Sequence, residues 1–107
     1  MVKNNMRPIL PGEILEEEFL KPLKHMGMTP TSLAKAIGVP PNRITAIIKE
    51  QRGITGDTAV RLSEFFGNTA KFWMNLQASY DLRVAEKNMS KQVIKHIHEQ
   101  RETLVPA

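Results

Sequence analysis

The sequence contains no cysteine, which excludes disulfide bonds, a thiol nucleophile and metal sites built from cysteine. It has no apolar run near the roughly 18 residues that a membrane span needs, and its first residues lack the apolar core of a signal peptide. We therefore expect a cytoplasmic protein that does not contact membranes. Asn-Gly and Asp-Gly turns and convincing alternation of apolar and polar residues are also absent, so strands are not expected.

Groups for catalysis or metal binding are equally scarce. His96 and His98 are two residues apart and do not share a helix face, so the histidines do not form a zinc pattern. The serines lack the strand–turn setting of a nucleophile elbow, and no glycine-rich phosphate loop is present. We expect a protein that is not an enzyme and that binds no cofactor and no metal.

What is present fits one basic globular domain. The chain has 107 residues, 41% of them hydrophobic, and a formal net charge of +4. The charge is uneven, because residues 12–18 hold four glutamates and no base, whereas residues 19–53 hold six bases and one acid. This balance permits nucleic-acid binding and suggests two surfaces with different partners. Ordinary solvated helix faces are the alternative.

Apolar residues recur at spacings of three and four along the whole chain, which predicts an all-α fold. Proline, glycine and capping residues divide it into helices over about 12–21, 29–37, 40–49, 55–66 and 69–82, followed by a weaker helix over about 90–101. We assign residues 1–83 to a DNA-binding and dimerisation domain and 84–107 to a C-terminal extension, partly helical or flexible. The expected inner residues are Ile14, Leu15, Phe19, Leu23, Leu33, Ala34, Ile37, Ile44, Ile47, Ile48, Ala59, Leu62, Phe65 and Phe66.

The second and third predicted helices fit a helix-turn-helix. Ala34 lies four residues before Gly38, and Ile44 and Ile47 lie six and nine residues after it. Two helices that cross steeply approach closely at a small residue, and glycine takes the bend between them without strain. Ile44 and Ile47 would pin the third helix to the second and leave its other face for DNA.

The outward face of the third helix is expected to read the major groove, since asparagine can pair with adenine and arginine with guanine. Residues at the start of the second helix are placed for phosphate contacts. A solvated polar position is the alternative for each of them. The candidate DNA-binding residues are Thr29, Thr31, Ser32, Asn42, Arg43, Thr45, Ala46, Lys49 and Arg52.

Three stretches resemble the HigA-type (VapI-type) antitoxins of the Cro/C1-like, or XRE, helix-turn-helix class. They are RPILPGEIL at 7–15, GVPPNRI at 38–44 and FWMNLQASYDL at 72–82. The family commonly has histidine where this chain has Leu10. The resemblance covers residues 7–83 and implies a five-helix core and a homodimer that binds an operator. It also implies a small basic partner toxin, commonly a RelE-like ribonuclease that cleaves mRNA, and leaves residues 84–107 unexplained.

The resemblance places the dimer contact in the fifth helix. Aromatic residues are enriched in association surfaces, and core packing is the alternative, favoured for Phe72 and Leu76. The candidate dimer residues are Trp73, Asn75, Leu76 and Tyr80.

The acidic residues Glu13, Glu16, Glu17 and Glu18 are candidates for the toxin contact. A protein that holds RNA needs a basic surface, which an acidic helix complements in charge. A solvated face is the alternative, with the toxin held elsewhere, for instance by residues 84–107. The predicted function is an antitoxin that represses its own operon; a free-standing repressor without a toxin is the second reading.

Overall fold

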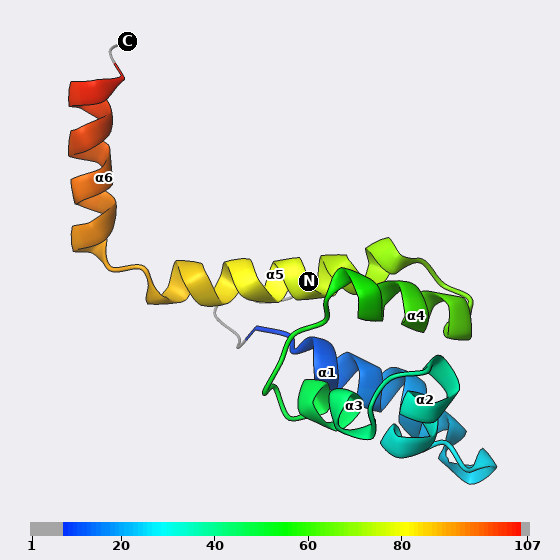
Figure 1. Cartoon of the computed structure of the whole chain (residues 1–107). Coiled ribbons are helices and arrows are strands. Elements are labelled where there is room, and N and C mark those ends of the chain that lie inside the picture. The colour runs from blue at the N-terminus through cyan, green and yellow to red at the C-terminus, as the bar shows by residue number, and fades with distance from the viewer. Residues whose placement is uncertain (1–7, 106–107) are drawn as a thin grey trace.

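The computed structural model describes residues 8–105, which form helices and no strand (Figure 1). This confirms the predicted all-α fold. Residues 1–7, including Arg7 of the first motif, and residues 106–107 lie outside the described residues. The elements are α1 (Pro11–Ile14), η1 (Leu15–Leu20), η2 (Lys21–Met26), α2 (Pro30–Ile37), α3 (Pro41–Ile48), α4 (Gly56–Phe66), α5 (Ala70–Asn88) and α6 (Lys91–Leu104).

The first helix is longer than the predicted range 12–21 and changes its geometry along its length. The α-helical α1 continues as a π-helix, η1, in which the N–H of Lys21 bonds to the carbonyl of Glu16, and then as a 3₁₀-helix, η2. Pro22 has no N–H with which to continue the α-helical pattern. The chain adjusts its winding around this residue and the helix ends at Gly27, whose φ is 89°.

Helices α2, α4, α5 and α6 begin at side-chain caps, and at the two starts where the sequence leaves two candidates, Thr55 or Asp57 and Asn68 or Thr69, the threonine is the cap. Thr29, Thr55, Thr69 and Ser90 each accept a hydrogen bond from a backbone N–H in the first turn of α2, α4, α5 and α6. Gly38 and Gly67 end α2 and α4 in the left-handed region. Helix α6 ends at Leu104 rather than near residue 101.

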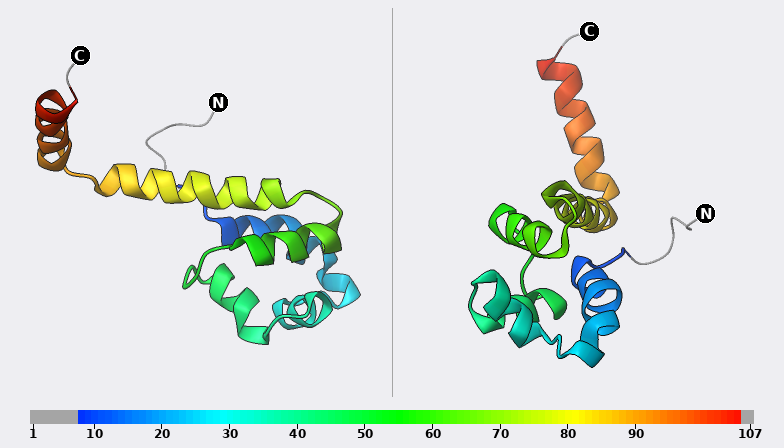
Figure 2. Two further views of the ribbon diagram at one scale, coloured as in Figure 1. Left: turned by 45° about the horizontal axis from the view of Figure 1, so that its top comes forward. Right: turned by 90° about the vertical axis from the view of Figure 1, so that its right-hand side faces the viewer.

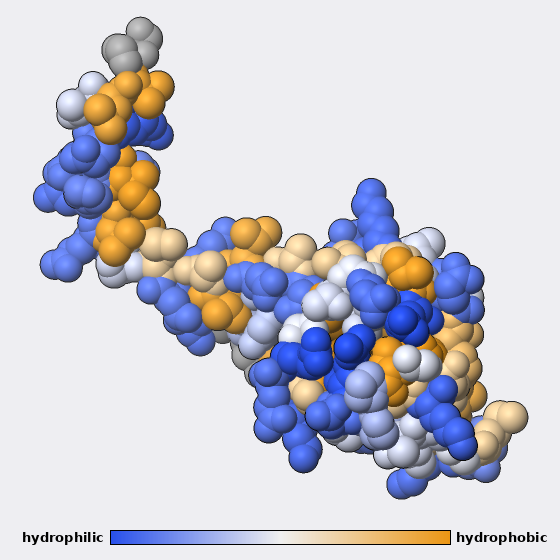
Figure 3. All heavy atoms as spheres, viewed as in Figure 1, coloured by the Kyte–Doolittle hydropathy of each residue, from blue (hydrophilic) through white to orange (hydrophobic). Residues whose placement is uncertain are grey.

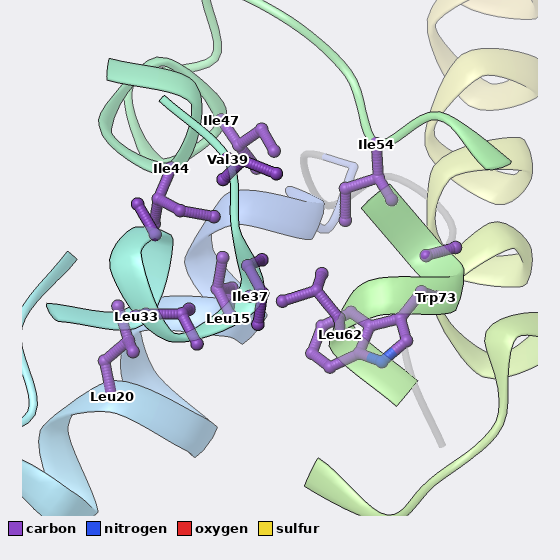
Figure 4. Packing of buried hydrophobic residues seen from close by; sticks show 12 residues of the cluster. Leu15, Leu20, Leu33, Ile37, Val39, Ile44, Ile47, Ile54, Leu62 and Trp73 are labelled. Atoms are coloured by element: carbon purple, nitrogen blue, oxygen red, sulfur yellow. The ribbon is translucent and has the colours of Figure 1, made fainter. Parts of the chain in front are cut away.

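One hydrophobic core joins η1 and the helices α2, α3, α4 and α5 (Figure 4). Ala34 is fully buried, as expected for a close helix crossing. Phe65 was expected to point inward, but 42% of it is exposed, because its position on α4 lies at the edge of the stripe formed by Ala59, Leu62 and Phe66. The buried hydrophobic residues are Leu15, Leu20, Leu33, Ala34, Ile37, Val39, Ile44, Ile47, Ile54, Ala59, Leu62 and Trp73.

Trp73 belongs to this core and not to the surface of the protomer. Its side chain is fully buried, and its Nε1–H donates to Asn68 Oδ1 at 2.9 Å. The rings of Phe19 and Phe72 have centroids 4.8 and 5.1 Å from that of Trp73. The expectation that Trp73 offers its side chain to a dimer partner is therefore wrong for this protomer. Phe72, favoured as core, is 38% exposed.

Helix α5 is the longest element, and α6 projects from its far end (Figures 1 and 2). The predicted domain boundary between residues 83 and 84 falls inside α5, because this helix continues without a break to Asn88. The molecule is consequently elongated, with principal extents of 59 × 27 × 24 Å. No helix among residues 8–105 is long and apolar enough to cross a membrane.

Candidate nucleic-acid interface

Helices α2 and α3 form the predicted helix-turn-helix. Gly38 has a φ of 76° and turns the chain between them, and Val39 is buried in the corner. Ile44 and Ile47 are buried against the core. Since successive residues of an α-helix are about 100° apart, these two isoleucines fix which side of α3 faces outward.

The outward side of α3 carries four of the predicted DNA-binding residues, Asn42, Thr45, Ala46 and Lys49. Their spacing of three and four residues puts them on one face, and Asn42 and Lys49 are exposed. Thr45 Oγ1 donates to the Asn42 carbonyl at 3.2 Å. The structure thus brings these four side chains together on the surface opposite the core.

Arg43 lies on the flank of α3 rather than on its outward face. Its Nη1 is 3.3 Å from Asp57 Oδ2, and its side chain is only 24% exposed. Its Nε is buried without a hydrogen-bond partner. The guanidinium is therefore tied to α4, and contact with a base would require it to leave or share Asp57.

Asp57 and Arg61 extend this tie to α2. Arg61 Nε donates to Asp57 Oδ2 at 2.9 Å, and Arg61 Nη1 donates to the carbonyls of Ile37 and Gly38 at 2.7 and 3.4 Å. One chain of polar contacts thus links the end of α2 to α4 and α3. Neither residue is predicted from the sequence, although their i, i+4 spacing is a usable signal.

Of the three residues predicted to contact phosphates at the start of α2, two form the cap of the helix and one does not. The Ser32 hydroxyl accepts a hydrogen bond from the Thr29 N–H at 2.8 Å, and Thr29 Oγ1 accepts one from the Ser32 N–H at 3.0 Å. These two side chains form a capping box. Thr31 is exposed beside them, so it is the residue of the three whose side chain is not used in the cap.

The loop after α3 is held by α5. Glu50 has a φ of 63°, a left-handed conformation that is uncommon for a non-glycine residue, and Arg52 is exposed just beyond it. The N–H of Ile54 donates to Gln77 Oε1 at 2.8 Å, and Gln77 Nε2 donates to Asp81 at 2.9 Å. Gln77 thereby positions the segment that carries Arg52, a role that no local pattern in the sequence indicates.

Helix α1 supports α3 from the core side. A Cβ added to Gly12 would lie 2.1 Å from the Ile47 carbonyl oxygen and 2.8 Å from Ile48 Cα. The two backbones are therefore in contact, on the side of α3 opposite Asn42. This places α1 on the side of α3 away from its outward face.

The remaining predicted dimer residues occupy α5. Asn75 is exposed and Tyr80 is half-buried. Leu76 is also half-buried and packs against the core. Since a partner chain is needed to test their role, it stays a prediction.

The acidic residues lie on α1 and η1. Glu13 and Glu16 are half-buried, whereas Glu17 and Glu18 are exposed. Glu17 Oε2 is 2.7 Å from Lys21 Nζ, and this hydrogen bond and charge raise the pKa of Lys21. Part of the acidic surface is thus already neutralised by an adjacent base, and its proposed toxin contact stays a prediction.

The packed α2–turn–α3 unit, with a polar and basic outward face, defines a helix-turn-helix DNA-binding protein. The helix-turn-helix family model matches residues 23–73. Virulence-associated protein I of Dichelobacter nodosus is 55% identical over 86 residues, which cover 80% of this chain and 77% of that protein. Antitoxin HigA-1 of Vibrio cholerae is 40% identical over 82 residues, covering 77% and 74%.

A solved structure of a relative also matches this chain. The Pseudomonas aeruginosa antitoxin HigA with the higBA promoter is 45% identical, with a TM-score of 0.73 and coverage of 81% of this chain and 91% of that chain. The chain belongs to the HigA-type antitoxins of the helix-turn-helix family. The resemblance and the Cro/C1-like fold inferred from the sequence are confirmed, and this is a family of DNA-binding regulators rather than enzymes.

Proposed function

We propose that the protein is an antitoxin that binds the operator of its own operon, represses it, and neutralises a partner toxin. The observation that carries this proposal is the outward face of α3, with Asn42, Thr45, Ala46 and Lys49 on one side and the buried isoleucines on the other. Support comes from relatives that are named antitoxins and from a relative solved with promoter DNA. Such a protein works in the cytoplasm.

For DNA recognition, α3 lies in the major groove. Asn42 pairs with a base edge, and the Thr45 and Ala46 methyl groups pack on thymine methyls. Lys49, Arg52 and Thr31 contact phosphates, which fix the register of the helix on the duplex. Arg43 reads a neighbouring base after exchanging part of its contact with Asp57.

The DNA-bound form is a two-fold homodimer. One recognition helix reads too few base pairs for operator specificity, and two helices about 34–36 Å apart enter successive major grooves on one face of the DNA. Asn75, Leu76 and Tyr80 on α5 contribute to the contact between protomers. Symmetry of the protein then requires a pseudo-palindromic operator.

The partner toxin is a small basic ribonuclease that binds the acidic segment formed by Glu13, Glu16, Glu17 and Glu18. An enzyme that holds polyanionic RNA needs a basic surface, and opposite charge speeds the encounter of the two proteins. Because α1 lies on the core side of α3, this segment is away from the DNA-reading face.

Co-expression with the small protein encoded next to this chain tests the antitoxin function. We expect the two to co-purify and the antitoxin to restore growth. Changing Glu16, Glu17 and Glu18 to Lys should slow their association and leave operator binding intact, whereas deleting residues 90–107 should leave toxin binding nearly unchanged. Operator binding without any co-purifying partner would instead identify a free-standing repressor.

A further inference from the structure

Asp57, in the first turn of α4, lies between two arginines. Arg61 Nε donates to Asp57 Oδ2 at 2.9 Å, and Arg43 Nη1 donates to the same oxygen at 3.3 Å. Arg61 also binds the carbonyl of Ile37 at the end of α2. Strongly hydrophilic side chains gather on the face formed by α3 and α4 (Figure 3). Asp57 thus connects a side chain of α3, the proposed recognition helix, to two other helices.

Arg43 is held so that only one end of its guanidinium can meet a base. It is the third residue of α3, and side chains near the start of a recognition helix are those that reach base edges. Its bond to Asp57 is its only hydrogen bond within residues 8–105. Because its Nε is buried, a base can bind this guanidinium only through Nη1 and Nη2.

The bond to Asp57 leaves enough donors for a guanine. A guanidinium carries five N–H groups, and Asp57 accepts from one of them, on Nη1. The bidentate contact to O6 and N7 of guanine needs two parallel donors, which the second hydrogen of Nη1 and a hydrogen of Nη2 supply. Arg43 can therefore bind a guanine and remain bound to Asp57 at the same time.

We propose that Asp57 is a positioning residue for base recognition, which stays bound to Arg43 in the DNA complex and orients its guanidinium toward a guanine. Ordering a free arginine side chain on DNA costs rotamer entropy, and the contact with Asp57 incurs this cost on folding instead. The inference rests on the proposed function, because it takes α3 as the recognition helix. It adds a specificity-determining residue on another helix, α4.

Two other roles of Asp57 make different predictions for base preference. If Asp57 competed with the base for Arg43, its removal would strengthen the preference. If its role were only to stabilise the fold, its removal would leave the preference of the folded protein unchanged. Loss of the negative charge alone raises the affinity for every duplex alike, so this effect cancels in a ratio of two affinities.

The test compares the full-length wild-type protein with Asp57→Asn, which keeps the shape of the side chain and removes its charge. Operators with single base changes first identify the base pair at which Arg43→Ala relaxes the preference. The quantity measured is the ratio of affinities for the operator and for its variant at this base pair. A good bidentate contact gives a wild-type ratio of about 5- to 150-fold.

We expect Asp57→Asn to lower this ratio at least about threefold, because Arg43 is then ordered only when it binds the guanine. The ratios at other base pairs should not change. In the Arg43→Ala background, Asp57→Asn should have no further effect on the ratio. Arg61→Ala is the matched control, since it removes the other partner of the same carboxylate oxygen and should keep the wild-type ratio.

An unchanged ratio or a larger ratio in Asp57→Asn would overturn the proposal. So would an Arg43→Ala protein with the wild-type preference at every base pair, because there would then be no base contact to orient. Since 59% of the Asp57 side chain is exposed, we expect Asp57→Asn to fold, which circular dichroism checks. Failure of the proposed function has a different signature, namely equal affinity of the wild-type protein for the operator and a scrambled duplex.

Discussion

Gly12 sets the distance between α1 and α3, the proposed recognition helix. Any side chain there would meet the backbone of Ile47 and Ile48, which cannot move aside as a flexible side chain can. The position of the proposed DNA-reading face therefore depends on a residue that packs against the opposite side of α3.

Gly12→Ala should lower the free energy of unfolding by about 1–3 kcal/mol, the usual cost of overpacking a core, and should weaken operator binding by displacing α3. Chemical denaturation and a DNA titration measure the two effects. Gly56→Ala is the matched control, because nothing lies within 4 Å of the added methyl at the start of α4. A Gly12→Ala protein as stable as the control would contradict the close packing of α1 on α3.

Trp73→Ala should lower the free energy of unfolding by about 3–5 kcal/mol, because a fully buried indole and its hydrogen bond to Asn68 are lost. The loss should be the same at low and high protein concentration, since the residue belongs to the protomer core. The half-buried Tyr80 is the comparison, and Tyr80→Ala should instead shift the monomer–dimer equilibrium seen in sedimentation. A Trp73→Ala protein that is stably folded but monomeric would show instead that Trp73 belongs to the dimer interface.

At the scale of elements, the contacts of Asp57 hold the helix-turn-helix as one unit. Asp57 binds Arg43 of α3 and Arg61 of α4, and Arg61 in turn binds two carbonyls at the end of α2. The two arginines share a partner but differ in position, because only Arg43 borders the outward face of α3. Their substitutions should therefore have different consequences.

Arg43→Ala should cost about 1–3 kcal/mol in operator binding and relax the preference at one base pair. Arg61→Ala should lower thermal stability, because two carbonyls at the end of α2 lose their donor, while the base preference of the folded protein stays the same. Affinities of the two variants for operators with single base changes distinguish a lost base contact from a loss of stability. If Arg43→Ala changes neither the operator affinity nor the base preference, Arg43 does not read a base and only connects α3 to α4.

The sequence predicted the elements that depend on local signals. The threonine caps of α2, α4 and α5, the left-handed glycines and the spacing from Ala34 to Ile47 all act within a few residues, so their pattern is visible in the chain. The long-range contacts were not visible. Burial of Trp73 depends on Phe19, more than fifty residues earlier, and the reach of Arg43 to Asp57 depends on how α3 lies against α4.

The first helix shows a further limit. Pro22 was expected to end it soon after residue 21, whereas the π and 3₁₀ segments carry the chain on to Met26. Apolar spacing predicts that a helix exists, but it does not resolve a change in helix type. The π segment also sets the positions of the exposed residues Glu17 and Glu18.

At the scale of the whole molecule, the basic residues around α3 should set the salt dependence of DNA binding. Lys49→Ala and Arg52→Ala should each weaken binding to all sequences alike and reduce the slope of log K against log salt by about one unit. Lys71→Ala, which removes the same charge from the first turn of α5, is the control and should leave the slope unchanged. A slope unaffected by Lys49→Ala and Arg52→Ala would mean that other residues contact the phosphates.

Fluorescence anisotropy with DNA from upstream of the gene for this protein measures whether α3 reads the operator of its own operon. At physiological salt, the wild-type protein should bind this DNA at least about a thousandfold more tightly than a scrambled duplex of equal length. Asn42→Ala should lose much of that ratio while keeping its affinity for the scrambled duplex. Equal affinity of the wild-type protein for the two duplexes would contradict the account.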